Sequence, residues 1–87
     1  MSNSLCFIVI RRHDLVKFVG PAVCKYFTCE GTQTAIIENG VVGLAITDEF
    51  EAWLGNIWRC EILVGDEIFD ADPADLTVLQ PGGANVV

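Results

Sequence analysis

The sequence has few cations, and this shortage argues against binding to nucleic acid. Five Lys and Arg stand against twelve Asp and Glu, which gives a net charge of −7. Proteins hold a phosphate backbone with Lys and Arg side chains that displace counterions, so nucleic acid is an unlikely partner for a chain this acidic. One alternative stays open, a nucleic-acid binder whose N-terminal basic residues all meet on one face. These residues are Arg11, Arg12, Lys17 and Lys25.

Long apolar runs are also missing. No stretch approaches the roughly 18 consecutive apolar residues that a membrane span needs. The first apolar run, Leu5–Ile10, ends at Arg11-Arg12, whereas a secretory signal places basic residues before a longer apolar stretch. We therefore expect no membrane association and a cytoplasmic protein. Cysteines stay reduced in that compartment, and the four thiols are Cys6, Cys24, Cys29 and Cys60.

The sequence has no complete set of zinc ligands. A structural zinc site needs a second pair of ligands beside Cys24 and Cys29, but Cys6, Cys60 and His13 are scattered. Cys24 and Cys29 are also an odd number of residues apart, so on a strand they point to opposite faces. We expect no metal and no cofactor, and we interpret the cysteines as small buried thiols. A ligand- or metal-binding domain that uses Cys and His stays open as an alternative.

Catalytic groups are scarce as well. His13 is the single histidine, and nothing near it in sequence resembles a nucleophile that it could activate. The carboxylates gather over residues 48–51 and 66–75, where solvated turns explain them. No glycine-rich loop of the G-x-x-x-x-G-K or G-x-G-x-x-G type is present. We expect no catalytic residue and a protein that is not an enzyme.

The chain is rich in apolar residues, at 52% of the total, which is too many for a disordered chain. Runs of β-branched and aromatic residues, broken by turn signals about every 8–12 residues, predict a mainly β fold. We expect one domain over residues 1–81 and a flexible tail over 82–87. The expected strands are 5–10, 22–29, 33–38, 41–47, 57–64, 67–71 and 76–80.

Three local signals predict how these strands connect. Asn39-Gly40 lies between two apolar runs and favours a type I′ hairpin joining 34–38 to 41–47. Gly43, inside the following strand, indicates a bulge or a close backbone approach. Asp72–Asp75, with Pro73 at its first helical position, predicts a single 3-10 turn.

Two segments favour short helices. Over residues 48–54, Phe50, Trp53 and Leu54 have the i, i+3, i+4 spacing of a helical face, and Asp48 stands where an N-cap belongs. Asp14 similarly predicts the cap of a single helical turn before the next strand.

The C-terminal half of the pattern resembles a known group. A tryptophan opens the strand Trp58–Leu63, and the stretch Ile68–Pro81 carries an acidic tight turn into a last strand of the form Asp75-Leu76-x-x-Leu79. This resembles short SH3-like proteins of phages, prophages and other mobile elements, over residues 41–81. The resemblance implies a small SH3-like, partly open β-barrel, with one short helix and the 3-10 turn, and it carries no catalytic residue.

Aromatic and acidic residues are the functional hints that remain. SH3-like barrels often bind peptides in aromatic-lined grooves, and aromatic residues are enriched at interface hot spots. We therefore predict a small non-enzymatic interaction module, either an accessory protein of a phage or mobile element or an inhibitor, that binds a protein partner. We interpret Trp58 as a core residue. The candidate partner-binding residues are Tyr26, Glu49, Phe50, Glu51 and Trp53, and the alternative that Trp53 covers the end of the barrel as a core or lid residue stays open.

Self-association is a further expectation. An open barrel leaves strand edges whose backbone groups pair readily with another chain. We expect a homo-oligomer to form through the edge at Leu5–Ile10 or at Gln33–Glu38.

Overall fold

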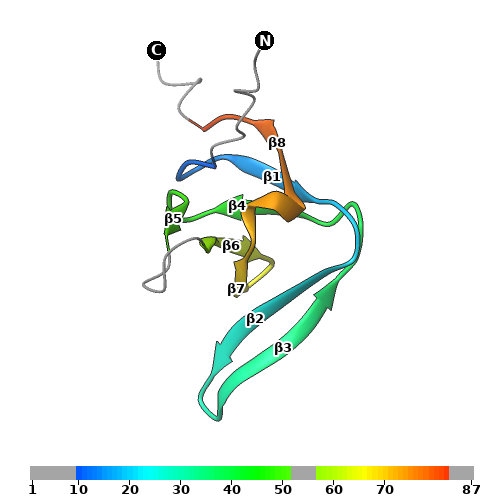
Figure 1. Cartoon of the computed structure of the whole chain (residues 1–87), viewed down its shortest axis with the longest axis vertical. Helices are drawn as coiled ribbons and strands as arrows, with labels where there is room; N and C mark the ends of the chain where they lie inside the picture. Colours follow the sequence, from blue (N-terminus) through cyan, green and yellow to red (C-terminus); the bar gives the residue numbers. More distant parts are fainter. Residues whose placement is uncertain (1–9, 52–56, 83–87) are drawn as a thin grey trace.

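The computed structural model describes residues 10–51 and 57–82, and this part of the chain is a curved antiparallel β-sheet (Figure 1). The sheet order is β3-β2-β7-β6-β4-β1-β8, and the short β5 pairs with β6. The mainly β prediction is confirmed. The strands are β1 (Leu15–Phe18), β2 (Ala22–Thr28), β3 (Gly31–Ile37), β4 (Val42–Ala45), β5 (Phe50–Glu51), β6 (Trp58–Val64), β7 (Glu67–Ala71) and β8 (Leu76–Gln80).

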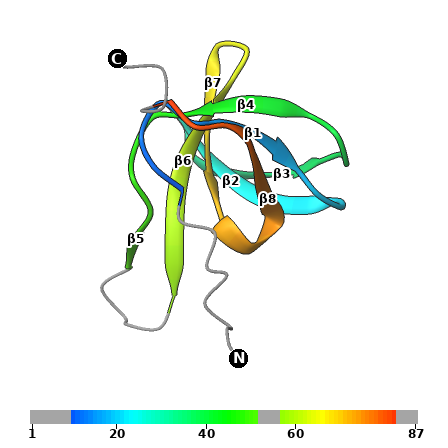
Figure 2. The same ribbon diagram turned by 90° about the horizontal axis from the view of Figure 1, so that it is seen from above.

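The sheet curls around a core without closing. Within the described residues, β3 pairs with β2 alone and β8 with β1 alone, so both ends of the sheet order are edges. Seen from above, the strands surround a common centre (Figure 2). That centre is one cluster of buried side chains, made of Ile10, Val16, Phe18, Ala22, Cys24, Ile37, Ala45, Cys60, Ile62, Phe69, Ala71 and Leu76.

The C-terminal order matches the prediction closely. A turn at Gly65, which has a φ of 65°, joins β6 to β7. The 3-10 turn η1 (Pro73–Asp75) follows, and its cap Asp72 accepts a hydrogen bond from the Ala74 amide at 2.9 Å. Among the described residues η1 is the sole helical element, and none of their helices is long and apolar enough to cross a membrane.

Gly43 confirms the predicted close approach of two backbones. A Cβ atom at this buried position would lie 2.5 Å from Ile62 Cγ2 and 2.8 Å from the Leu63 carbonyl oxygen. Only a residue without a side chain lets β4 lie this close to β6.

The hairpin predicted at Asn39-Gly40 is wrong. Val41 donates to the Glu38 carbonyl across a turn, but β3 pairs with β2 and β4 pairs with β1 and β6. Only Gly40 has a positive φ, of 94°, whereas a type I′ turn needs two such residues. The turn instead contacts the segment that links β1 to β2, where the Gly20 amide donates to Asn39 Oδ1 at 2.9 Å. The chain after the turn runs beside β1, because the Val41 carbonyl accepts from the Phe18 amide at 2.8 Å and β4 pairs with β1.

The long hairpin is formed one connection earlier. β2 and β3 pair over their whole length, from Ala22↔Ile37 at the root to Thr28↔Gly31 at the tip. Only the root enters the core, and all side chains from Phe27 to Thr34 are exposed. The β2–β3 ribbon therefore extends from the body of the sheet (Figure 1).

The helix predicted over 48–54 is also wrong, as far as the structure describes it. Phe50–Glu51 is strand β5, and residues 52–54 lie outside the described residues. Asp48 does not cap a following turn, because its carboxylate accepts from the Arg12 amide at 2.7 Å. Glu49 Oε1 likewise accepts from the Ile10 amide at 2.8 Å, and the Glu49 amide donates to the Ile10 carbonyl. Amides that are distant in sequence therefore occupy the carboxylate oxygens that would have capped a local helix.

Asp14 is no helix cap either, because strand β1 begins at the next residue. Its carboxylate is buried and accepts from two amides, Arg11 at 2.9 Å and Gly82 at 2.8 Å. The expected tail over 82–87 therefore starts at a residue that is bonded to the core, and 83–87 lie outside the described residues, as does most of the expected first strand 5–10.

Trp58 is not a core residue, since 48% of its surface is exposed. It opens β6 opposite Glu51 of β5, beyond the cluster that Cys60 and Ile62 enter. Cys60 and Ile62 alternate into the core along β6, but the core ends before the first residue of this strand.

Candidate functional site: an acidic, aromatic fork

The candidate site arises where strands β2 and β7 separate. Their ladder has two registered pairs, Lys25↔Asp70 and Tyr26↔Phe69. Beyond Tyr26, β2 continues with β3 into the ribbon, whereas β7 turns back into β6 at Gly65. The two strands thus leave a fork between them. Its hollow, with a volume of about 510 Å³, is lined by Tyr26, Phe27, Glu61, Asp66, Glu67 and Ile68.

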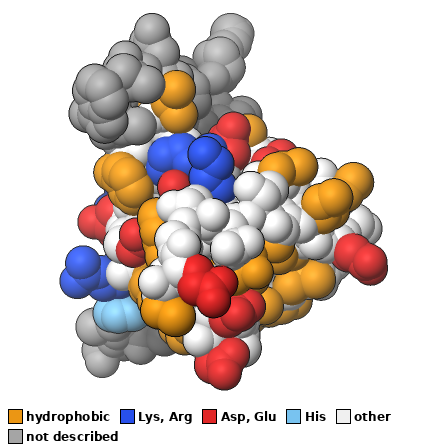
Figure 3. All heavy atoms as spheres, turned by 90° about the horizontal axis from the view of Figure 1, so that it is seen from below, with side chains coloured by type: hydrophobic (Ala, Val, Ile, Leu, Met, Phe, Trp, Pro, Cys, Tyr) orange, Lys and Arg blue, Asp and Glu red, His pale blue; other side chains and the backbone are white. Residues whose placement is uncertain are grey.

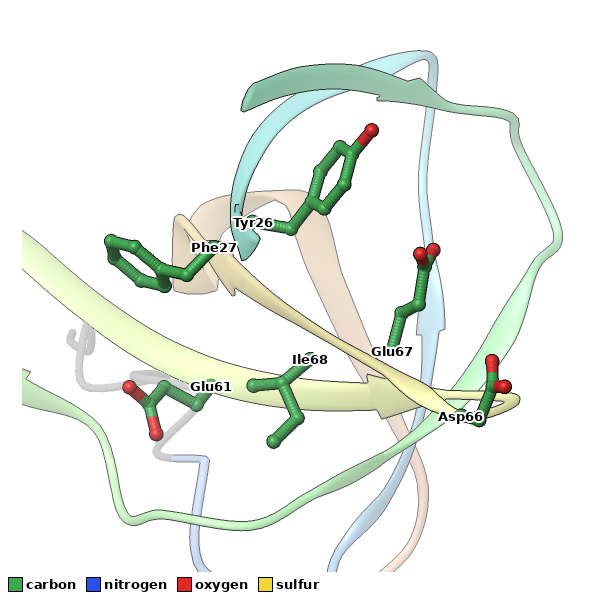
Figure 4. Close-up of a pocket in the computed structure, with 6 residues that line it drawn as sticks. All are labelled: Tyr26, Phe27, Glu61, Asp66, Glu67 and Ile68. Carbon is green, nitrogen blue, oxygen red and sulfur yellow. The ribbon is translucent and has the colours of Figure 1, made fainter. Parts of the chain in front are cut away.

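Strand alternation places these side chains on both sides of the fork. Tyr26 and Phe27 are consecutive on β2 and point apart, and Ile68 and Glu67 do the same on β7 (Figure 4). The Tyr26 ring packs edge-on against Phe69, with ring centroids 5.4 Å apart. Phe27 and Ile68 are 67% and 43% exposed. The fork therefore offers one anchored aromatic ring and two apolar side chains that face solvent.

Three carboxylates, Glu61, Asp66 and Glu67, line the same hollow. The nearby Arg59 does not neutralise them, because its Nε bonds Asp70 Oδ1 at 2.9 Å and its Nη2 bonds the Asp70 carbonyl at 2.9 Å. That is the one ion pair within the described residues. Carboxylates and hydrophobic side chains lie side by side on the face of the molecule that is seen from below (Figure 3). The fork is thus a negatively charged site with apolar walls.

The structure brings one of the predicted binding residues, Tyr26, to the fork. Phe50 is 41% exposed but lies on β5, opposite Arg59 at the start of β6. In sheet order β6 and β7 separate it from Tyr26, a spread of about 14 Å for three strand spacings. Glu49 is occupied by its two hydrogen bonds to Ile10. The side chains of Glu51 and Trp53 lie outside the described residues.

Sequence reasoning missed Phe27, Glu61 and Ile68 and treated Asp66 and Glu67 as solvated turn residues. A signal for Phe27 was present in β2. If Cys24 faces the core, strand alternation sends Val23 and Phe27 to the solvent side, where large apolar residues are informative. No local pattern shows that β2 and β7 separate after two pairs.

The predicted thiols divide by burial. Cys24 and Cys60 are fully buried and Cys29 is exposed at the tip of the ribbon. Burial raises the pKa of Cys24 to about 11, with Asp75 adding to the effect, and that of Cys60 to about 12, with Glu49 adding. Cys6 is outside the described residues. Across residues 10–51 and 57–82, no three His, Cys, Asp or Glu side chains are grouped to hold a metal ion.

The basic residues of the N-terminal segment are divided between two regions. Arg11 and Arg12 are exposed in the turn that leads to β1, which carries Lys17. Lys25 lies on β2, and β7, β6 and β4 stand between β2 and β1 in the sheet order.

Comparison with known proteins finds no protein family, no curated protein and no solved structure that matches this chain.

Proposed function

We propose that the protein is a small non-enzymatic interaction module that takes a basic segment of a partner protein into the fork. The observation that carries the proposal is the lining of the hollow, three carboxylates beside Tyr26, Phe27 and Ile68. An excess of carboxylates at the fork raises the local concentration of cations. The faces of Tyr and Phe rings also attract Arg and Lys side chains.

An arginine of the partner suits the fork better than a small cation. Its planar guanidinium stacks on an aromatic ring and donates to two carboxylate oxygens at once. Its apolar stem would lie against Ile68 and Phe27, which solvent otherwise covers.

We further propose that the fold is an open SH3-like barrel and that the protein is an accessory factor or inhibitor from a phage or another mobile element. The order β6, tight turn, β7, η1 and β8 supports the fold part. An acidic fork that imitates phosphate groups would suit the inhibition of a basic, nucleic-acid-binding protein.

Binding of a fluorescent nona-arginine peptide, measured by anisotropy, tests the function. The double variant Asp66→Asn/Glu67→Gln should weaken binding about 2- to 30-fold, as expected for two exposed ion pairs of about 0.2–1 kcal/mol each. The double variant Glu30→Gln/Glu38→Gln is the matched control, because it makes the same charge change at exposed positions outside the hollow.

An aromatic variant separates a specific site from general attraction. Phe27→Ala should weaken binding of the peptide, whereas Leu79→Ala, which truncates an exposed apolar residue on β8, should not. Equal losses in both charge variants, with no effect of Phe27→Ala, would show that only net charge attracts the peptide and would refute the fork.

A further inference from the structure

The outer edge of β3 is a second surface, on the opposite side of β2 from the fork. Within the described residues this seven-residue strand pairs only with β2. It carries no charged side chain, and Gly31 to Thr34 and Ile36 are exposed. A strand edge of this length without charge is an open template for another strand.

The ribbon that carries this edge has little support of its own. Its far half, from Phe27 through Thr34, is exposed on both faces, and a two-stranded ribbon alone is marginally stable in water. Large apolar residues are also exposed on one face, with Val23 at 62%, Phe27 at 67% and Ile36 at 66%. Pairing with a further strand would supply support that residues 10–51 and 57–82 do not give to the far half of the ribbon.

We infer that two copies of the chain pair through their β3 strands, antiparallel and about a two-fold axis at Thr34. In this register Thr34 faces Thr34 of the second copy, and Ile36 faces Thr32. On the exposed face, Phe27 is opposite Thr32 and Val23 is opposite Ile36 within each chain. The pairing therefore joins Phe27 and Thr32 of one copy to Ile36 and Val23 of the other in one row across four strands.

Charge favours a second copy as the occupant. Residues 22–37 hold one Lys and one Glu, Lys25 and Glu30, a sum of 1 − 1 = 0, while the whole chain carries −7. Two copies can thus approach through the ribbon without facing each other's carboxylates. The surface is also self-complementary, as the isologous interface of a two-fold dimer requires.

The molar mass in solution, measured by analytical ultracentrifugation over a concentration series, tests the inference. The wild-type chain should reach the mass of a dimer. Thr34→Glu should raise the dissociation constant at least about tenfold, because two carboxylates then face each other across the axis. Thr34→Lys should do the same, and an equimolar mixture of the two variants should restore the dimer mass through a Glu–Lys pair.

Folding of the Thr34→Glu variant is controlled within the design, whereas Thr34→Lys faces Lys25, so its folding is checked by circular dichroism before it is mixed with Thr34→Glu. Thr34 is exposed and opposite Lys25 in its own hairpin, so Thr34→Glu gains a cross-strand partner in the monomer. Thr77→Glu is the matched control on the other edge strand, since Thr77 is exposed and opposite Lys17. It should leave the dimer intact.

Four outcomes would overturn the inference. The first two are a wild-type monomer at every concentration and a Thr34→Glu chain that keeps the dimer mass. The third is a loss of the dimer in Thr77→Glu, which would assign the interface to β8, and the fourth is a filament or an indefinite series of masses, which would contradict a closed two-fold pair. Nona-arginine binding by Thr34→Glu separates this test from that of the fork, because the edge variant should bind the peptide as the wild type does.

Discussion

Asp14 is the one charged side chain that is buried among the described residues, with 3% of its surface exposed. It joins the segment before β1 to the segment after β8 by accepting hydrogen bonds from the Arg11 and Gly82 amides. These charge-assisted bonds explain why a carboxylate is tolerated here.

Asp14→Ala should lower the free energy of unfolding by about 2–3 kcal/mol, because two amides lose their acceptor away from bulk water. Urea denaturation measures the change. Asp48→Ala is the control: it removes a carboxylate that accepts one exposed amide, so its cost should be below about 1 kcal/mol. Equal costs for the two variants would show that the burial of Asp14 does not matter.

The buried thiols should make stability depend on pH in alkaline solution. The folded pKa values of about 11 for Cys24 and about 12 for Cys60 exceed the ordinary thiol value of 9.0. Below pH 9 both states keep the protons, so this contribution is fully present. Above pH 9 only the unfolded chain releases them, and the free energy of unfolding should fall by up to about 1 kcal/mol per pH unit for each thiol, until the folded thiols also titrate.

Urea denaturation between pH 8 and 11 measures this slope, compared with a Cys24→Ala/Cys60→Ala variant. The variant should be less stable at pH 8 but should lose stability less steeply as the pH rises. Parallel slopes would assign the alkaline loss to other groups.

At the scale of elements, the close contact of β4 with β6 depends on a single glycine. Gly43 lets the two backbones meet, and the register runs on through Leu44↔Leu63 and Ala45↔Ile62. Because protein cores are closely packed, the space between Gly43 and β6 does not hold even one added methyl group.

Gly43→Ala should therefore destabilise the protein by about 1–3 kcal/mol, the usual cost of overpacking a core. Thermal or urea unfolding measures it. Val42→Ala, at the exposed neighbouring residue, should change stability by less than about 1 kcal/mol. A Gly43→Ala variant as stable as the wild type would mean that β4 moves freely away from β6.

At the scale of the whole molecule, charge opposes compaction. A net charge of −7 on 87 residues produces self-repulsion in the folded state, and salt screens it over a Debye length of about 8–10 Å at physiological ionic strength. The two proposed surfaces differ in charge: three carboxylates line the fork, and strand β3 carries no charged side chain.

The melting temperature should accordingly rise when NaCl increases from about 10 to about 200 mM. Differential scanning calorimetry at fixed protein concentration measures it, and Thr34→Glu, expected to be monomeric, excludes an effect of salt on pairing. A falling melting temperature would mean that attractive pairs such as Arg59–Asp70 outweigh the repulsion.

Much of the local structure followed from the residues alone. The 3-10 turn η1, with Pro73 at its first helical position, and the bounds of β8 depend on neighbours in sequence, so their patterns predicted them. The close approach at Gly43 was also visible, because a glycine inside a strand has few other uses.

The tertiary structure alone decided which strands pair and which carboxylates are occupied. Asp14 and Asp48 have the local signature of helix caps, yet each accepts an amide that is distant in sequence. The fork depends on where the β2–β7 ladder ends, and the free edge depends on β3 pairing with β2 instead of β4. Local propensities are worth a fraction of a kcal/mol per residue, and long-range burial and hydrogen bonding outweigh them.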